Sequence, residues 1–128
     1  MARLRGAEKA SMTGLIATEQ VGVIFDGAFC PYFHHAVELI GRRWTGAIVR
    51  AMLCGVGRFG ELTEAIPDLS DRMLSERLKE LEAEGIVART VFPSTPVRIE
   101  YRLTPKGLAL APILEAISVW AGDWAEAQ

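Results

Sequence analysis

The 128-residue sequence is poor in cysteine, has almost no net charge and lacks a long uncharged hydrophobic run. Two cysteines, Cys30 and Cys54, are too few for a disulfide framework, which favours a reducing compartment such as the cytoplasm. A formal net charge of −2 excludes a protein that coats nucleic acid by bulk charge. The apolar segment near the N-terminus is interrupted by Glu8, Lys9 and Glu19, so neither a membrane span nor an export signal is expected. These features predict a cytoplasmic protein without a membrane partner.

Hydrophobic residues make up half of the chain, and its length suits one compact domain rather than two. Residues 1–29 are expected to be an N-terminal extension, partly disordered or packed as an arm on a partner subunit. Residues 30–128 are expected to form the folded domain. Within it, residues 30–106 hold eleven Lys and Arg, whereas residues 107–128 hold none. Nucleic-acid binding would therefore depend on a local basic patch in residues 30–106.

The segment from Ser70 to Gly85 has a clear helical pattern. Leu74, Leu78 and Leu81 recur at i, i+4 and i+7, which predicts one narrow buried stripe. Ser70 is a typical N-cap, and Gly85 supplies a left-handed stop. The opposite, polar face carries Arg72, Ser75, Glu76 and Lys79. Taken alone, this pattern is also typical of a solvated surface helix, so its meaning depends on the flanking segments.

Shorter helical patterns precede this segment over Tyr32–Ile40, Trp44–Leu53 and Arg58–Ile66. Pro67 ends the third pattern, and the tight turn before Ser70 predicts a helix-turn-helix. Residues alternate in polarity or are β-branched over Ile86–Phe92 and Arg98–Leu103, which predicts two strands. A hairpin directly after the second helix of a helix-turn-helix is a wing. The expected fold is therefore mainly α with a small β-hairpin wing.

The last helix is expected to run unbroken from Lys106 to about Ala127, after the cap Thr104-Pro105. Its apolar surface is larger than one intramolecular face requires. A second subunit is the economical way to bury such a surface.

Five motifs identify a resemblance to a known family. They are Cys30-Pro31, the run from Leu39 to Thr45, the run from Arg58 to Leu62, the run from Leu74 to Val87 and the run from Arg98 to Gly107. In order and spacing they closely resemble the HxlR-type winged-helix transcriptional regulators, relatives of the MarR group, from Cys30 to about Trp120. Residues 1–29 have no counterpart.

The resemblance implies a homodimeric protein that binds double-stranded DNA. It places the Ser70–Glu84 helix in the major groove, the wing against the backbone or minor groove, and the first and last helices at the dimer interface. The expected interface residues are Phe33, Val37, Leu110, Ile113, Leu114, Ile117, Trp120 and Trp124.

Reading base edges requires polar side chains on the inserted helix and cations around it for phosphates. Arg72, near the helix start, suits a bidentate contact with guanine, while Lys79 lies further along toward phosphate. Arg98, beside the wing tip, suits the minor groove or a phosphate. Arg77 lies on the flank of the buried stripe, and we assign it an intramolecular salt bridge. The full expected interface is Arg72, Ser75, Glu76, Lys79, Arg42, Arg43, Arg58, Arg98, Ser94 and Thr95. Each of these basic residues, taken alone, is equally well explained as a solvated surface charge. The prediction of DNA binding therefore depends on their occurring together.

Cys30 stands directly before a predicted helix, where the positive end of the helix dipole favours a thiolate. In redox-sensing members of the resembled family, a cysteine at this position responds to oxidants. Cys30 is therefore a candidate sensor, the alternative being a partly buried, inert thiol, whereas Cys54 is expected in the core. His34, His35 and Glu38 fall within two turns of Cys30, but no second ligand motif accompanies them, so neither metal nor cofactor is expected.

The predicted function is a transcriptional regulator that acts as a homodimer on a pseudo-palindromic operator and responds to an oxidant, an electrophile or a small ligand. The alternative is a winged-helix module that binds proteins and not DNA, which the acidic balance and Glu76 on the polar face keep open. An enzyme is not expected, because the sequence combines no nucleophile, base and orienting group.

Overall fold

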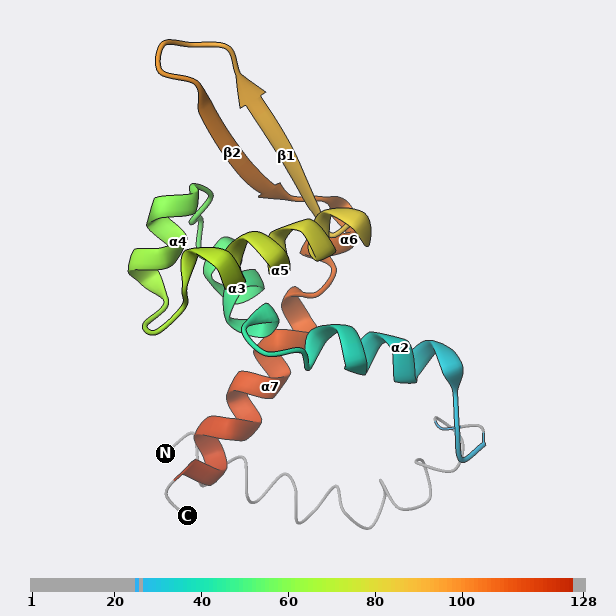
Figure 1. Cartoon of the computed structure of the whole chain (residues 1–128). Coiled ribbons are helices and arrows are strands. Elements are labelled where there is room, and N and C mark those ends of the chain that lie inside the picture. The colour runs from blue at the N-terminus through green and yellow to red at the C-terminus, as the bar shows by residue number, and fades with distance from the viewer. Residues whose placement is uncertain (1–24, 26, 126–128) are drawn as a thin grey trace. The chain divides into compact units, whose positions relative to one another are not determined.

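The computed structural model describes Phe25 and residues 27–125. Its elements, in chain order, are α2 (Pro31–Ile40), α3 (Thr45–Leu53), α4 (Phe59–Ala65), α5 (Asp71–Ala83), β1 (Val87–Phe92), β2 (Arg98–Leu103), α6 (Pro105–Leu108) and α7 (Ala111–Trp124) (Figure 1). Residues 37–114 form one compact unit, here called the winged-helix unit. The described residues up to Ala36 and from Glu115 onward form the terminal unit. The expected arm at residues 1–29 lies mostly outside the described residues.

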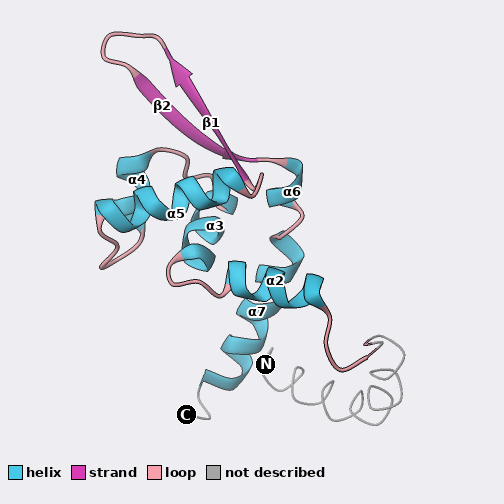
Figure 2. Ribbon diagram, turned by 45° about the vertical axis from the view of Figure 1, so that its right-hand side comes forward, coloured by secondary structure: helices cyan, strands magenta, loops and turns pink. Residues whose placement is uncertain are grey.

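The winged-helix unit has the predicted fold class. Strands β1 and β2 form an antiparallel hairpin in a register that runs from Val87 opposite Leu103 to Phe92 opposite Arg98. In both ribbon views the hairpin projects away from α4, α5 and α6 (Figure 2). Mainly helical structure with one β-hairpin wing is therefore confirmed.

Helices α4 and α5 form the predicted helix-turn-helix. Asp68, in the connection between them, has a φ of 67°, a left-handed conformation that aspartate tolerates better than most residues. The Ser70 hydroxyl caps α5 by accepting a hydrogen bond from the Met73 amide at 3.1 Å. Gly85, with a φ of 75°, turns the chain from α5 toward β1. The α5 boundaries therefore follow from the capping chemistry that the sequence displays.

The core of the winged-helix unit is built around the leucine stripe of α5. Leu74, Leu78 and Leu81 are buried, as the periodicity predicted. The complete buried apolar cluster comprises Ile48, Val49, Met52, Leu62, Ile66, Leu69, Leu74, Leu78, Leu81, Ile86, Val87 and Leu114. This cluster fixes α5 against α3 and α4, so that its polar face is the outward one.

The C-terminal end of the wing is joined tightly to the core. The Thr104 hydroxyl donates to the Gly85 carbonyl and accepts from the Gly107 amide, which begins α6. A β-carbon at Gly107 would overlap the carbonyl oxygen of Ile86. Glycine is therefore required at this close approach, and the wing cannot shift independently of α5.

The prediction of one unbroken C-terminal helix was wrong. Helix α6 ends at Leu108 and α7 begins at Ala111. Pro112 has no amide hydrogen to bond the Leu108 carbonyl, so an α-helix cannot continue through this point. The last predicted turn, residues 126–128, lies outside the described residues.

The prediction that Cys54 belongs to the core was also wrong, because its side chain is exposed. The buried stripe of α3 consists of Thr45, Ile48, Val49 and Met52, and Cys54 follows the helix at its C-cap, off this stripe. The sequence had suggested that the helix begins at Trp44. That residue is instead the N-cap, with a φ of 77°.

Two of the eight residues expected at the dimer interface contact the hydrophobic core of their own chain. Leu114 is buried in the core of the winged-helix unit, and Leu110 packs against that core. Leu110 keeps part of its surface exposed, whereas Leu114 is covered within its own chain, and an interface role for any of the eight residues stays a prediction. The other six, Phe33, Val37, Ile113, Ile117, Trp120 and Trp124, are all exposed large apolar side chains. No helix among the described residues is long and apolar enough to cross a membrane.

Candidate nucleic-acid interface

The outer face of α5 presents the four polar residues that the sequence singled out. Arg72 and Glu76 form an ion pair, with 3.4 Å between Nε and Oε1, in which the Arg72 side chain is 90% exposed. Such an exposed pair contributes at most about 1 kcal/mol. Ser75 and Lys79 lie on the same side of the helix, beside the base of the hairpin. Arg72 is therefore held only loosely and can exchange Glu76 for another acceptor.

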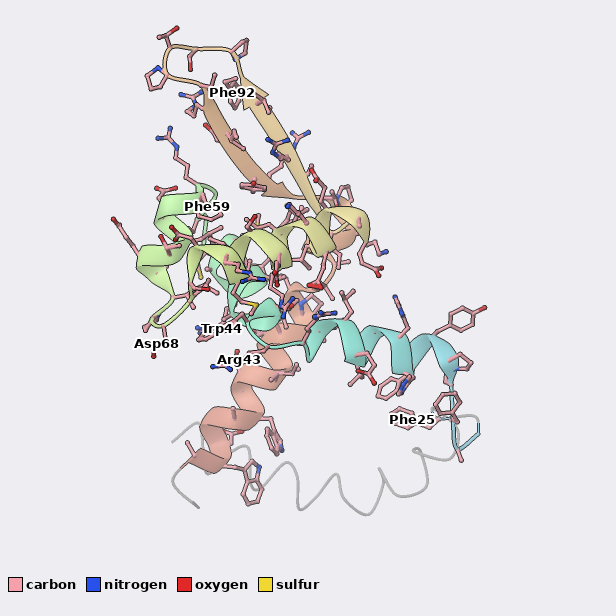
Figure 3. The ribbon with its side chains drawn as sticks, viewed as in Figure 1. Phe25, Arg43, Trp44, Phe59, Asp68 and Phe92 are labelled. Carbon is pink, nitrogen blue, oxygen red and sulfur yellow. The ribbon has the colours of Figure 1, made fainter. Side chains whose placement is uncertain are left out.

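The wing carries a second group of predicted residues. Phe92, labelled in Figure 3, ends β1. The Arg98 guanidinium, on the paired strand, lies 4.4 Å from the centre of the Phe92 ring. Its Nε donates to Glu100 at 2.9 Å, and Arg58, at the start of α4, lies 3.8 Å from the same carboxylate. Ser94 and Thr95 are exposed at the tip. Arg98 and Arg58 are thus both paired with the Glu100 carboxylate.

Arg42 and Arg43 lie in the connection between α2 and α3. The Arg43 guanidinium lies over the Trp44 ring, 5.2 Å from its centre. Both residues are labelled in Figure 3. Arg42 pairs with Glu80 of α5 at 3.1 Å. This pairing brings the connection against α5, so Arg42 also has a role inside the protein.

Arg77 joins α5 to the same connection. Its side chain is only 9% exposed and contacts Glu80 at 2.6 Å, which confirms the predicted intramolecular salt bridge. Its Nε also donates to the backbone carbonyl of Arg43 at 2.9 Å. A buried arginine therefore positions α5 relative to the end of α2.

Arg89 lies at the candidate interface, although it was not among the residues predicted there. This residue lies in β1 directly opposite Tyr101 of β2. It lines a groove of about 290 Å³ together with Ser75, Leu78, Lys79, Glu82 and Tyr101. A basic residue within an alternating strand was the available signal, but only the packing of the hairpin on α5 brings Arg89 toward Lys79.

Cys30 is exposed at the start of α2, in the terminal unit. Its backbone carbonyl accepts a hydrogen bond from the His34 amide at 2.9 Å, and the His34 ring lies 5.4 Å from that of Phe29. Within the described ranges, no three His, Cys, Asp or Glu side chains are placed to hold a metal ion. Cys30 is therefore an accessible thiol.

Comparison with known proteins decides which family this architecture represents. The family model of the HxlR-like helix-turn-helix matches residues 39–128, which include α3 to α7 and therefore the whole interface above. This chain belongs to the HxlR-like family. The match begins after most of α2, so Cys30 lies outside it.

Relatives of this HxlR-like chain are HTH-type transcriptional regulators. The HTH-type transcriptional regulator YvaP of Bacillus subtilis is 59% identical over 95 residues, which cover 74% of this chain and 88% of YvaP. The reduced form of the transcriptional regulator YodB from B. subtilis superposes with a TM-score of 0.69 at 45% identity, covering 78% of this chain and 98% of YodB. The redox regulator HypR in its reduced form gives a TM-score of 0.70 at 35% identity, covering 74% of this chain and 94% of HypR. YodB also has diamide-treated and quinone-bound structures, and HypR an oxidized one.

Proposed function

We propose that this HxlR-like protein is a cytoplasmic transcriptional regulator that binds a pseudo-palindromic DNA operator as a homodimer. The observation that carries the proposal is the exposed polar face of α5, flanked by a projecting wing, in a chain of this family. A major groove about 12 Å wide admits one α-helix, and the backbone beside it needs cations. Helix α5 is the element proposed to enter the major groove. Arg58, Arg98 and Arg43 are the cations proposed to contact the DNA backbone.

Arg72 is the proposed base-reading side chain. A bidentate contact with guanine discriminates between bases by about 1–3 kcal/mol, more than an exposed ion pair contributes. Arg72 can therefore leave Glu76 for a base, while Glu76 becomes free to accept from cytosine. The pair is therefore compatible with DNA binding, because an exposed ion pair is weak enough to give way to a contact with a base.

Substituting Arg72 and Arg98 separates base reading from backbone binding. Arg72→Ala is expected to cost about 1–3 kcal/mol on the preferred site and to relax sequence choice. Arg98→Ala should lower the affinity for all DNA sequences alike. It should also reduce the slope of log affinity against log salt concentration by about one unit. Fluorescence anisotropy titrations at several salt concentrations, with the region upstream of its own gene and a scrambled duplex, measure both quantities. Equal, sequence-blind losses would remove Arg72 from base reading. Absence of salt-dependent binding by the parent protein would instead favour the protein-interaction alternative.

A second copy of this chain is the proposed partner of α2 and α7. None of the ten residues of α2 is buried, although Tyr32, Phe33 and Val37 are large and apolar. In α7 only Leu114 is buried among fourteen residues. Two short helices with this much exposed apolar surface require a partner, and symmetric pairing uses the same faces twice.

The proposed signal is an oxidant or electrophile that reacts with Cys30. The redox-treated and quinone-bound forms solved for YodB motivate this choice of effector. Cys30 is exposed directly before Pro31, the first residue of α2, so a reagent in solution can reach its thiol. Joining Cys30 to the same thiol of the second copy removes two electrons and two protons, which diamide accepts. A new covalent link at α2 would change the spacing of the two α5 helices in a dimer.

The two exposed cysteines provide a matched test of this signal. Diamide is expected to weaken DNA binding by the parent protein, and Cys30→Ser is expected to abolish this loss, because no thiol remains at α2. Cys54→Ser, which removes the other exposed thiol, should respond like the parent protein. Anisotropy titrations before and after diamide, followed by reduction with dithiothreitol, measure the response. Unchanged diamide sensitivity of Cys30→Ser would end the sensor proposal.

A further inference from the structure

The basic side chains around α5 and the wing fall into two groups. Arg58, Arg72 and Arg98 each lie beside a glutamate in the free protein. In contrast, Lys79 and Arg89 form no ion pair with any described residue, and both are exposed. An unpaired cation has no partner to give up when it binds an anion. Lys79 and Arg89 are therefore better placed than the paired group to bind a phosphate.

Both unpaired cations line the same groove. Ser75, Lys79 and Glu82 recur at i, i+4 and i+7 along α5, and Arg89 faces them from β1. The Tyr101 side chain completes the lining from β2. At about 290 Å³, the groove has room for roughly ten water molecules at the volume each occupies in the liquid, so a phosphate group fits.

We propose that this groove binds one backbone phosphate of duplex DNA, between the Lys79 ammonium and the Arg89 guanidinium. The inference rests on the proposed DNA-binding function and adds a defined contact to it. Arg89 offers a fork of donors that matches phosphate oxygens, and the Ser75 and Tyr101 hydroxyls are further donors. The groove lies between the helix that enters the major groove and the strands of the wing. A phosphate bound there fixes how deeply α5 inserts.

Glu82 gives the proposal a second, opposite prediction. Its carboxylate lines the groove and repels a phosphate. Glu82→Gln should therefore strengthen binding to every duplex, whereas Lys79→Gln and Arg89→Gln should weaken it.

Salt dependence tests the contact first. The Lys79→Gln/Arg89→Gln double variant is expected to lower the slope of log affinity against log salt by about one unit per bound protomer, without altering sequence preference. Lys79→Arg/Arg89→Lys should keep the parent slope, which shows that the charges and not the fold are responsible. Arg102→Gln is the control, because Arg102 pairs with Ala88 and lies on the other face of the hairpin. A double variant with the parent slope would overturn the proposal.

Neutral phosphates then locate the contact on the DNA. The probe is a duplex selected by the parent protein from a random pool, carrying a single methylphosphonate at successive positions. At one position per half-site, the methylphosphonate should lower the DNA affinity of the parent protein about as much as the Lys79→Gln/Arg89→Gln substitutions do. At that position it should not lower the affinity of the double variant any further. If every position affects the two proteins equally, the groove holds no backbone phosphate.

Inorganic phosphate distinguishes a site for free anions from a DNA contact. Titrated alone into the protein, it should shift the amide resonances near Arg89 only weakly. Tight, saturable binding of inorganic phosphate, together with an unchanged DNA salt slope in the double variant, would assign the groove to a free anion and overturn the proposal. Failure of the parent protein to select any duplex would overturn the proposed function as well, an outcome distinct from a parent that binds DNA and a double variant that binds equally.

Discussion

Arg77→Met is expected to lower the free energy of unfolding by about 2–3 kcal/mol, a large effect for one polar side chain. Arg77 is buried and makes two charge-assisted hydrogen bonds, to Glu80 at 2.6 Å and to the Arg43 carbonyl at 2.9 Å. Methionine fills much of the volume but satisfies neither acceptor. Glu80 keeps Arg42 as a partner at 3.1 Å, which holds the loss below that of a fully orphaned buried charge.

The same substitution should weaken DNA binding to all sequences. The Arg43 carbonyl stands directly before Trp44, which has a φ of 77°, so the bond from Arg77 holds a strained backbone in place. Without that bond, the connection between α2 and α3 can relax, and α5 loses a fixed orientation. Affinity should therefore fall for specific and scrambled duplexes together, unlike the selective loss expected for Arg72→Ala.

Urea unfolding followed by circular dichroism, at one protomer concentration, measures the stability loss. Arg50→Met is the matched control, because Arg50 is an exposed arginine on α3 and its removal should change stability by less than about 0.5 kcal/mol. Arg77→Lys keeps the charge but cannot bond both acceptors as the guanidinium does. Its loss of stability should therefore lie between those of Arg77→Met and Arg50→Met. Equal stability of Arg77→Met and Arg50→Met would show that Arg77 does not fix α5.

Local patterns were enough to predict most of the fold. The spacing of Leu74, Leu78 and Leu81, with Ser70 and Gly85 at the ends, fixed α5 because each feature acts within a few residues. The break between α6 and α7 also has a local cause, Pro112, but strong apolar periodicity on both sides concealed it. Periodicity reports what a helix would bury and says little about whether its hydrogen bonds are continuous.

The candidate site was less predictable, because its geometry depends on tertiary packing. The pairing of Arg58 with Glu100 links residues 42 positions apart, and no sequence spacing announces it. Arg89 is one charged residue in an alternating strand until the hairpin brings it beside Lys79. Sequence reasoning therefore identified residue types suited to DNA, whereas the structure distinguishes the cations that are already paired from those that are not.

Ile117→Glu is expected to convert the proposed dimer to monomers and to reduce operator affinity by at least about 100-fold. Ile113, Ile117, Trp120 and Trp124 recur at i, i+4, i+7 and i+11, so they share one face of α7, and each is close to half exposed or more. A glutamate in the middle of this face would be buried without a partner in both protomers, at several kcal/mol for each. A lone protomer reads one half-site, so it loses the second set of contacts that symmetric binding adds.

Light scattering after size exclusion measures the mass, and anisotropy titration measures the affinity. Because Ile117 is already exposed within its own chain, the variant should keep the helical circular dichroism of the parent protein. Val119→Glu is the matched control: Val119 is equally apolar and exposed but lies on another side of α7, more than 90° from the stripe at about 100° per residue. If Val119→Glu dissociates the protein and Ile117→Glu does not, the subunits meet through the other side of α7. If the parent protein is itself a monomer that binds its operator fully, α7 has a different partner and the two-fold arrangement of α5 helices is wrong.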